Sequence, residues 1–119
     1  MPDAQARLDV SKNGEIDVIV LLDRNILDEA NIQIIGDEIS SLIETNPNPR
    51  VLIDFKNVEH LSSAALGTLI NVNNKIRQKD GILRLATIAP QLLEVFKITK
   101  LDHLFHIHPT SEDALKSFG

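Results

Sequence analysis

Between residues 51 and 86 an apolar strand pattern, a helical pattern and a second apolar strand pattern follow one another. Val51–Phe55 is a short apolar run typical of a strand buried on both faces. Apolar residues then recur at helical spacing from Ala65 to Ile76, and Ile82–Ala86 is again mostly apolar. The intervening helix is long enough for a crossover, so the two strands are predicted to be parallel partners in a right-handed βαβ unit.

The residues before this unit predict an antiparallel hairpin followed by a helix. Residues 6–11 and 15–22 are apolar enough for two strands, and Asn13-Gly14 between them is a strong hairpin signal. Ile32, Ile35, Ile39 and Leu42 then mark one face of a helix from about Glu29 to Glu44, and Asp28 is placed to cap its start. The run from Asn46 to Pro49 contains two prolines and ends this helix.

The residues after the unit predict a third helix, a short strand and a last helix. Pro90 is a favoured first helical residue, Leu104–Ile107 is predicted to be the last strand, and Ser111 opens a final helix ending near Phe118. The predicted fold class is α/β, with residues 1–119 forming a single domain. Its mixed four- to five-stranded sheet has an N-terminal antiparallel hairpin and parallel βαβ units, with helices packed on it.

Composition limits the function classes that this fold can serve. The net charge is −5 and the basic residues are scattered singly, which argues against a nucleic-acid surface. No cysteine occurs, so disulfides and thiolate metal sites are excluded. No apolar run approaches the roughly 20 residues that cross a bilayer, and the N-terminus lacks an apolar signal core. We therefore expect a cytoplasmic protein that contacts neither membrane nor nucleic acid.

Two adjacent serines, Ser62 and Ser63, stand where the first strand of the unit gives way to its helix. A serine at a helix start accepts backbone N–H bonds, and its hydroxyl lies at the end of the helix that attracts negative charge. The residues alone favour simple capping, which is common at helix starts. The same position also suits a phosphate, and one residue can serve both roles.

The residues from Ser62 to Gly67 align without a gap with the run Asp-Ser-Ser/Thr-Gly-Leu-Gly. Similarity continues through Asp80-Gly81 and then through Ile88-Ala89-Pro90 to Leu101. In this order of motifs, over roughly the C-terminal two-thirds, the chain resembles the anti-sigma factor antagonists of the STAS-domain family. Ser62 stands at the acidic position of the family's run, and Ala64 and Ala65 stand at its hydroxyl and glycine positions.

The resemblance implies a STAS fold and a switch protein that is not an enzyme. Ser63 takes the position of the serine that an anti-sigma factor kinase phosphorylates, and ATP then belongs to that partner. Asp28 and Asp23 are both candidates for the family's acidic residue on the loop before the first helix, and Asp28 matches without a gap. The residues implied to meet the partner are Asp28, Asp23, Ser62, Ala64, Ala65 and Gly67. No cofactor is implied.

Several alternatives stay open. One is a STAS scaffold, not phosphorylated, within a signalling or transport-regulating assembly, and another is a sensor of a nucleotide or small anion at the same helix start. His103, His106 and His108 have a spacing that suits a metal, but the apolar residues among them explain the segment as a strand, so we expect no metal. Ser63 and His60 with an aspartate do not make a catalytic triad on any known spacing.

Overall fold

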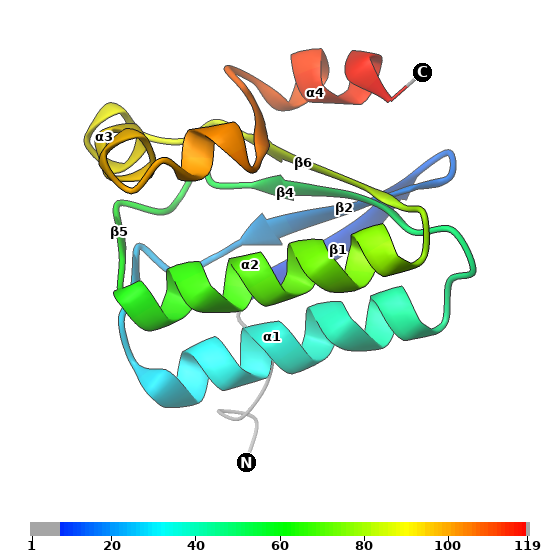
Figure 1. The fold of residues 1–119 in the computed structure, drawn as a ribbon, viewed down its shortest axis with the longest axis horizontal. Coiled ribbons are helices and arrows are strands. Elements are labelled where there is room, and N and C mark those ends of the chain that lie inside the picture. Colours follow the sequence, from blue (N-terminus) through cyan, green and yellow to red (C-terminus); the bar gives the residue numbers. More distant parts are fainter. Residues whose placement is uncertain (1–7, 119) are drawn as a thin grey trace.

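A five-stranded sheet with the strand order β1-β2-β4-β6-β7 forms the centre of the computed structural model, which describes residues 8–118 (Figure 1). Strand β1 pairs antiparallel with β2, and the other neighbours pair in parallel. The strands are β1 (Leu8–Asn13), β2 (Ile16–Leu21), β4 (Arg50–Asp54), β6 (Ile82–Ala86) and β7 (His106–His108). The predicted mixed sheet and its parallel βαβ unit are therefore confirmed. Residues 6 and 7 of the first predicted strand lie outside the described residues.

Helices cover both faces of the sheet. Helices α1 and α2 lie side by side on one face, and α4 lies on the other (Figure 1). The helices are α1 (Glu29–Glu44), α2 (Ser63–Gln78), α3 (Pro90–Ile98) and α4 (Ser111–Ser117). All four occupy the predicted positions. No helix within residues 8–118 is long and apolar enough to cross a membrane.

The alternation of side chains along β4 divides the core between the two helical layers. Val51 and Ile53 face α1 and α2 in the larger cluster, whereas Leu52 packs with Ala114 and Phe118 against α4. All three β4 side chains are fully buried. The apolar run of β4 therefore reflects a strand buried on both faces, as its sequence predicts.

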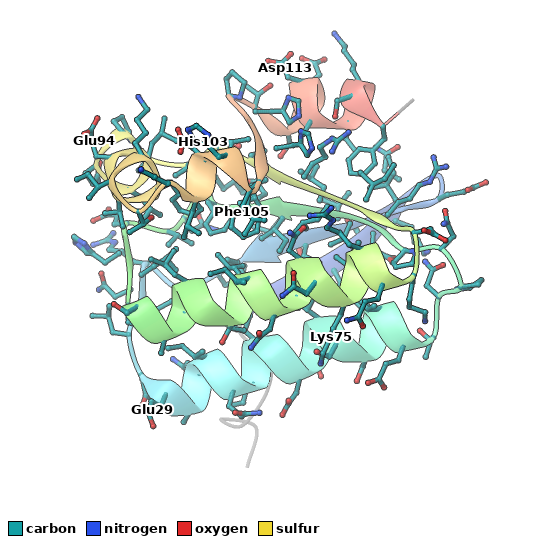
Figure 2. The ribbon with its side chains drawn as sticks, in the orientation of Figure 1. Glu29, Lys75, Glu94, His103, Phe105 and Asp113 are labelled. Carbon is teal, nitrogen blue, oxygen red and sulfur yellow. The ribbon has the colours of Figure 1, made fainter. Side chains whose placement is uncertain are left out.

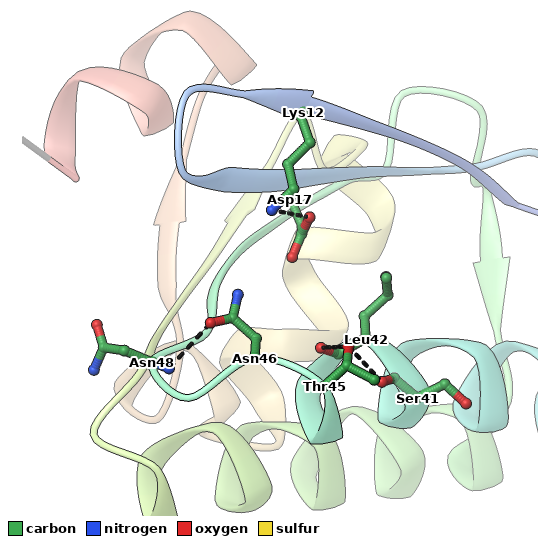
Figure 3. Close-up of polar contacts among 7 residues, drawn as sticks. All are labelled: Lys12, Asp17, Ser41, Leu42, Thr45, Asn46 and Asn48. Carbon is green, nitrogen blue, oxygen red and sulfur yellow. Dashed lines mark hydrogen bonds and ion pairs between the residues drawn. The ribbon is translucent and has the colours of Figure 1, made fainter.

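The C-terminal end of α1 is closed by polar side chains (Figure 3). Thr45 Oγ1 donates to the carbonyl oxygens of Ser41 and Leu42, both at 3.2 Å. Asn46 Oδ1 then accepts from the backbone N–H of Asn48 at 3.0 Å, which fixes the turn into β4. These contacts satisfy carbonyls that a helix end leaves without partners.

Gly81 forms the tight connection from α2 into β6. Its N–H donates to the carbonyl of Ile76 at 2.8 Å. A Cβ on Gly81 would lie 2.3 Å from the carbonyl oxygen of Pro49 and 2.8 Å from Ile76 Cγ2. The connection therefore requires glycine because no side-chain carbon fits between these two segments.

Two elements differ in place from their predictions. The hairpin turn consists of Gly14 and Glu15, one residue later than predicted, because Asn13 still pairs with Ile16. The last strand was predicted over Leu104–Ile107, and those bounds are wrong. Leu101–His103 forms a 3-10 helix, η2, and β7 begins only at His106.

The burial of Phe105 explains why the segment after α3 forms a helical turn before strand β7 begins. The N–H groups of Leu104 and Phe105 both donate to the carbonyl of Leu101 at 3.0 Å. This turn buries Phe105, whose ring meets Phe96 edge to face with centroids 6.0 Å apart. The apolar residues here thus serve a helical turn, although their sequence suits a strand equally well.

Candidate functional site

A second, two-stranded sheet joins the loop after β2 to the start of α2. It consists of β3 (Asn25–Ile26) and β5 (His60–Leu61), which pair in parallel, and the sequence analysis missed both strands. The carbonyl of Arg24 accepts from the N–H groups of Glu59 and His60 at 2.7 and 3.2 Å. The carbonyl of Ile26 accepts from Ser62 N–H at 3.1 Å. This pairing holds residues 24–26 alongside residues 59–62, directly before the helix that Ser63 begins.

Ser62 is the N-cap of α2. Its backbone is extended, with φ −81° and ψ 168°, and its Oγ accepts from the N–H of Ala65 at 3.1 Å. Its carbonyl accepts the first helical bond, from Leu66 N–H at 3.1 Å. The structure therefore assigns the capping role to Ser62, because the bond to Ile26 places this residue at the turn into the helix.

Ser63 is the first residue of α2 and is exposed. Within residues 8–118 its hydroxyl has no hydrogen-bond partner. The first turn of α2 carries no acidic side chain, so its free N–H groups present the positive end of the helix dipole. Ser63 therefore offers an accessible hydroxyl in surroundings that favour an added negative charge.

The alanines and the glycine after Ser63 divide between surface and core. Ala64 is exposed, whereas Ala65 is only 4% exposed and packs in the core. Gly67 lies one helical turn after Ser63, and a Cβ there would meet no atom within 4 Å. Ser63, Ala64 and Gly67 therefore form a smooth surface of small residues.

Both candidate aspartates lie on the loop that β3 brings to this surface. Asp28 is exposed and caps α1, accepting from Ala30 N–H at 3.4 Å. Asp23 is half-buried and accepts from Asn31 Nδ2 at 3.3 Å. The predicted cap at Asp28 is thereby confirmed. Both carboxylates lie at the N-terminal end of α1.

Two exposed leucines on the same loop were missed. Leu22 and Leu27 are 52% and 54% exposed and flank the segment that contains Asp23 and β3. The sequence analysis assigned Leu22 to the predicted strand over residues 15–22, whereas β2 ends at Leu21 and leaves Leu22 on the loop. Together with Ser63, Ala64 and Gly67 the two leucines define what we call the switch surface.

The space beneath the switch surface is small and apolar. A cavity of about 20 Å³ lies between α1, α2 and the sheet, lined by Ile26, Leu61, Ala65 and other apolar groups. It has room for about one water molecule. The cavity is therefore too small for a ligand, and any partner would meet the exposed residues above it.

The four histidines lie on β5, η2 and β7. His60 is exposed on β5, and within residues 8–118 no hydrogen bond joins its side chain to Ser63. His106 and His108 lie on β7 and His103 lies on η2. In the part of the chain that the structure describes, no three histidine, aspartate or glutamate side chains are grouped to hold a metal ion.

Comparison with known proteins identifies one family over most of the chain. The model of the STAS domain matches residues 7–114. A Bordetella bronchiseptica protein named as a putative anti-sigma factor antagonist, BtrV, is 26% identical over 95 residues, which are 80% of this chain and 81% of that protein.

Solved structures share the fold. An anti-sigma factor antagonist (STAS) domain protein from Planctomyces limnophilus has a TM-score of 0.84 at 21% identity, over 92% of this chain and 96% of that chain. The cell fate determinant SpoIIAA from Bacillus, solved in its phosphorylated form, has a TM-score of 0.73 at 18% identity, over 94% of this chain and 99% of that chain.

Proposed function

Because the chain belongs to the STAS domain family, we propose that it is an anti-sigma factor antagonist switched off by phosphorylation of Ser63. In this proposal the unmodified protein binds a kinase-type anti-sigma factor in the cytoplasm and frees the sigma factor. The partner supplies ATP, and this chain contributes a binding surface and the acceptor hydroxyl. The names of the BtrV and Planctomyces relatives support the antagonist role, and the phosphorylated form of SpoIIAA supports the switch.

The observation that carries the proposal is the division of roles between the two serines. Ser62 Oγ is held by the N–H of Ala65 at 3.1 Å, whereas the Ser63 hydroxyl is exposed and has no partner within residues 8–118. A kinase needs an accessible hydroxyl, and Ser63 is exposed, whereas Ser62 is half-buried and its oxygen already caps the helix. The resemblance places the acceptor at this same residue.

The switch surface has the composition of a protein contact. Leu22 and Leu27 supply exposed apolar area on the loop that pairs with the segment before Ser63, and Ala64 and Gly67 let a partner approach the helix closely. Asp23 and Asp28 add carboxylates at the rim, although each also accepts a bond from the first turn of α1. Ala65 contributes through the core and not through contact, because it is buried.

A phosphate on Ser63 would act on binding and not on folding. At the start of α2 a dianion interacts favourably with exposed N–H groups, by roughly 0.3–1 kcal/mol. In an interface the same group must lose its water or meet partner carboxylates. An unpaired buried charge there costs on the order of 2–5 kcal/mol, which corresponds to a loss of affinity from about 30-fold to several thousand-fold.

The direct test is to map the phosphate after incubation with the cognate kinase and ATP. Mass spectrometry should find phosphate on Ser63, and Ser63→Ala should abolish it. Ser62→Ala should reduce the rate less, because Ser62 acts as the cap. Phosphate on Ser62 and none on Ser63 would contradict the proposal. No phosphate together with retained partner binding would favour the scaffold alternative.

A further inference from the structure

The outer edge of strand β1 has no partner strand among the described residues. β1 lies at one end of the sheet order β1-β2-β4-β6-β7, so β2 is its only neighbour within residues 8–118. Strand β7, at the other end, has three residues, whereas β1 has six. A very short edge strand offers few backbone groups to another chain. In the described part of the chain, β1 is therefore the one long edge of this sheet that is open.

The hairpin determines which backbone groups of β1 point away from the sheet. A two-residue turn follows Asn13, so Asn13 and Ile16 exchange both hydrogen bonds. Hydrogen-bonded and non-hydrogen-bonded pairs then alternate along the antiparallel ladder. The N–H and C=O groups of Leu8, Val10 and Lys12 therefore point outward. Within the described residues these groups make no backbone hydrogen bond outside the β1–β2 ladder.

The usual protections of an edge strand are missing from β1. Natural edge strands carry proline, bulges or outward charges that prevent pairing with another chain. β1 contains no proline, and its pairing with β2 runs without a bulge over all six residues. Its one lysine, Lys12, has its Nζ 3.1 Å from Oδ1 of Asp17 on β2 (Figure 3). The charge of Lys12 is thus balanced within the chain and does not block the edge.

An apolar side chain lies near the middle of this edge. Val10 is opposite Ile19, so its side chain lies on the face of the sheet that α1 and α2 cover. It is nevertheless 39% exposed, because no strand lies beyond β1 within the described residues. A strand added at this edge would cover Val10 and would remove apolar area from water.

We propose that β1 pairs antiparallel with β1 of a second copy of this chain, with the two copies of Val10 opposite each other. A two-fold axis perpendicular to the sheet keeps the same face of both copies on one side, so residues of one face meet each other. Leu8, Val10 and Lys12 then meet Lys12, Val10 and Leu8 of the second copy, with two hydrogen bonds for each pair. A shift by two residues in either direction leaves two such pairs within β1.

The side chains suit this register. The two copies of Val10 make an apolar pair, and Leu8 lies opposite the aliphatic stem of Lys12. On the other face, Asp9 lies opposite a serine of the second copy, which can donate a hydrogen bond to it. No like charges are directly opposite. A shift by two residues toward the N-terminus would instead place the two copies of Asp9 opposite each other, which destabilises a strand pair.

The proposed pair is small, so its association should be weak. Pairing over the six residues of β1 belongs to the class of interfaces that bury less than roughly 1,200 Å². We therefore expect dimers to form at about 100 µM protein or above. No residue of β1 belongs to the switch surface, so this inference does not depend on the proposed function.

Sedimentation velocity of the full chain, from about 10 µM to about 1 mM, measures the association. The mean mass should rise with concentration from 13.2 kDa toward twice that value. In a mixture of isotope-labelled and unlabelled protein, isotope-filtered NMR should show contacts between Val10 methyl groups of different copies. A constant mass of 13.2 kDa would overturn the proposal. A dimer without contacts between Val10 methyl groups would also overturn it.

Charged variants of Val10 test the register. Val10→Lys and Val10→Glu each place like charges opposite each other, so each should weaken self-association about ten-fold or more. Val10 is exposed, so both variants should keep the native circular dichroism spectrum. A mixture of the two variants pairs lysine with glutamate and should restore the association to within about three-fold of the native value. Native self-association of either variant alone, or no association in the mixture, would contradict the register.

Ile98→Lys is the matched control. It also replaces an exposed apolar side chain, 77% exposed, by lysine. Ile98 ends α3, the helix of the labelled Glu94 in Figure 2, which packs with η2 on the β7 side of the sheet. This variant should change the association by less than about two-fold. Equal losses in Ile98→Lys and Val10→Lys would show non-specific association and would reject pairing at the β1 edge.

Discussion

Replacing each of the two adjacent serines by alanine should separate capping from phosphate acceptance. Ser62→Ala removes the 3.1 Å bond from Ala65 N–H to Ser62 Oγ and leaves that N–H without its cap. The loss of such a cap costs about 1 kcal/mol, within a range of roughly 0.5–2 kcal/mol. For a chain of 119 residues this corresponds to a fall in Tm of about 4 °C.

Ser63→Ala should leave stability almost unchanged. The Ser63 hydroxyl has no partner to lose within residues 8–118, and alanine is the better helix former. We expect the free energy of unfolding to stay within about 0.5 kcal/mol of the native value, or to rise slightly. Urea unfolding followed by circular dichroism measures both variants, with unchanged slopes showing that the same surface unfolds.

Ser62→Asp serves as the matched control for the cap. Aspartate is as good an N-cap as serine, and its charge suits the helix start, so this variant should match or exceed the native stability. The division of roles is refuted if Ser63→Ala destabilises the protein as much as Ser62→Ala does. It is also refuted if Ser62→Ala has no effect.

Three further predictions concern the rest of the fold. Gly81→Ala should lower the free energy of unfolding by about 1–3 kcal/mol in urea melts, because its Cβ would lie 2.3 Å from the carbonyl oxygen of Pro49. Gly67→Ala has open space around its Cβ and should raise the free energy of unfolding by about 0.5–1 kcal/mol. Equal effects of the two variants would contradict this packing. A chelator should leave the Tm unchanged, and a loss of several degrees restored by zinc would show that the C-terminal histidines need metal. The lowered pKa of His106 means that the unfolded chain binds more protons, so stability should fall as the pH drops through about 6.5 and below. His106→Gln should flatten that part of a pH series of melts, and an unchanged slope would argue against the lowering of the His106 pKa by burial and by the charge of Arg84.

The parts of the fold that the sequence predicts well are those with local signals. The Asp28 cap and the prolines after Asn46 set the bounds of α1, and both act within a few residues of the helix ends. The apolar run of β4 and the helical period of α2 likewise give the βαβ unit without reference to the rest of the chain. The structure agrees with each of them.

The parts that differ depend on contacts between distant residues. Strands β3 and β5 have two residues each, which is too short for any periodicity to show. The turn around Leu101 is set by burial of Phe105 against Phe96, and a strand pattern fits the same residues. Which serine caps α2 depends on the bond from Ser62 N–H to the carbonyl of Ile26, far away in sequence. The sequence therefore points to the two serines as candidates but does not show which of them caps the helix.

The affinity of Ser63→Asp for the kinase-type anti-sigma factor tests the central claim most directly. Calorimetric titration should show binding at least about 30-fold weaker than that of the native protein, with the free energy of unfolding changed by less than about 1 kcal/mol. Ser63→Ala should bind as the native protein does. Ser11→Asp adds the same charge at an exposed residue of β1, outside the switch surface, and should bind normally. Native affinity in Ser63→Asp, or an equal loss in Ser11→Asp, would contradict a switch at Ser63.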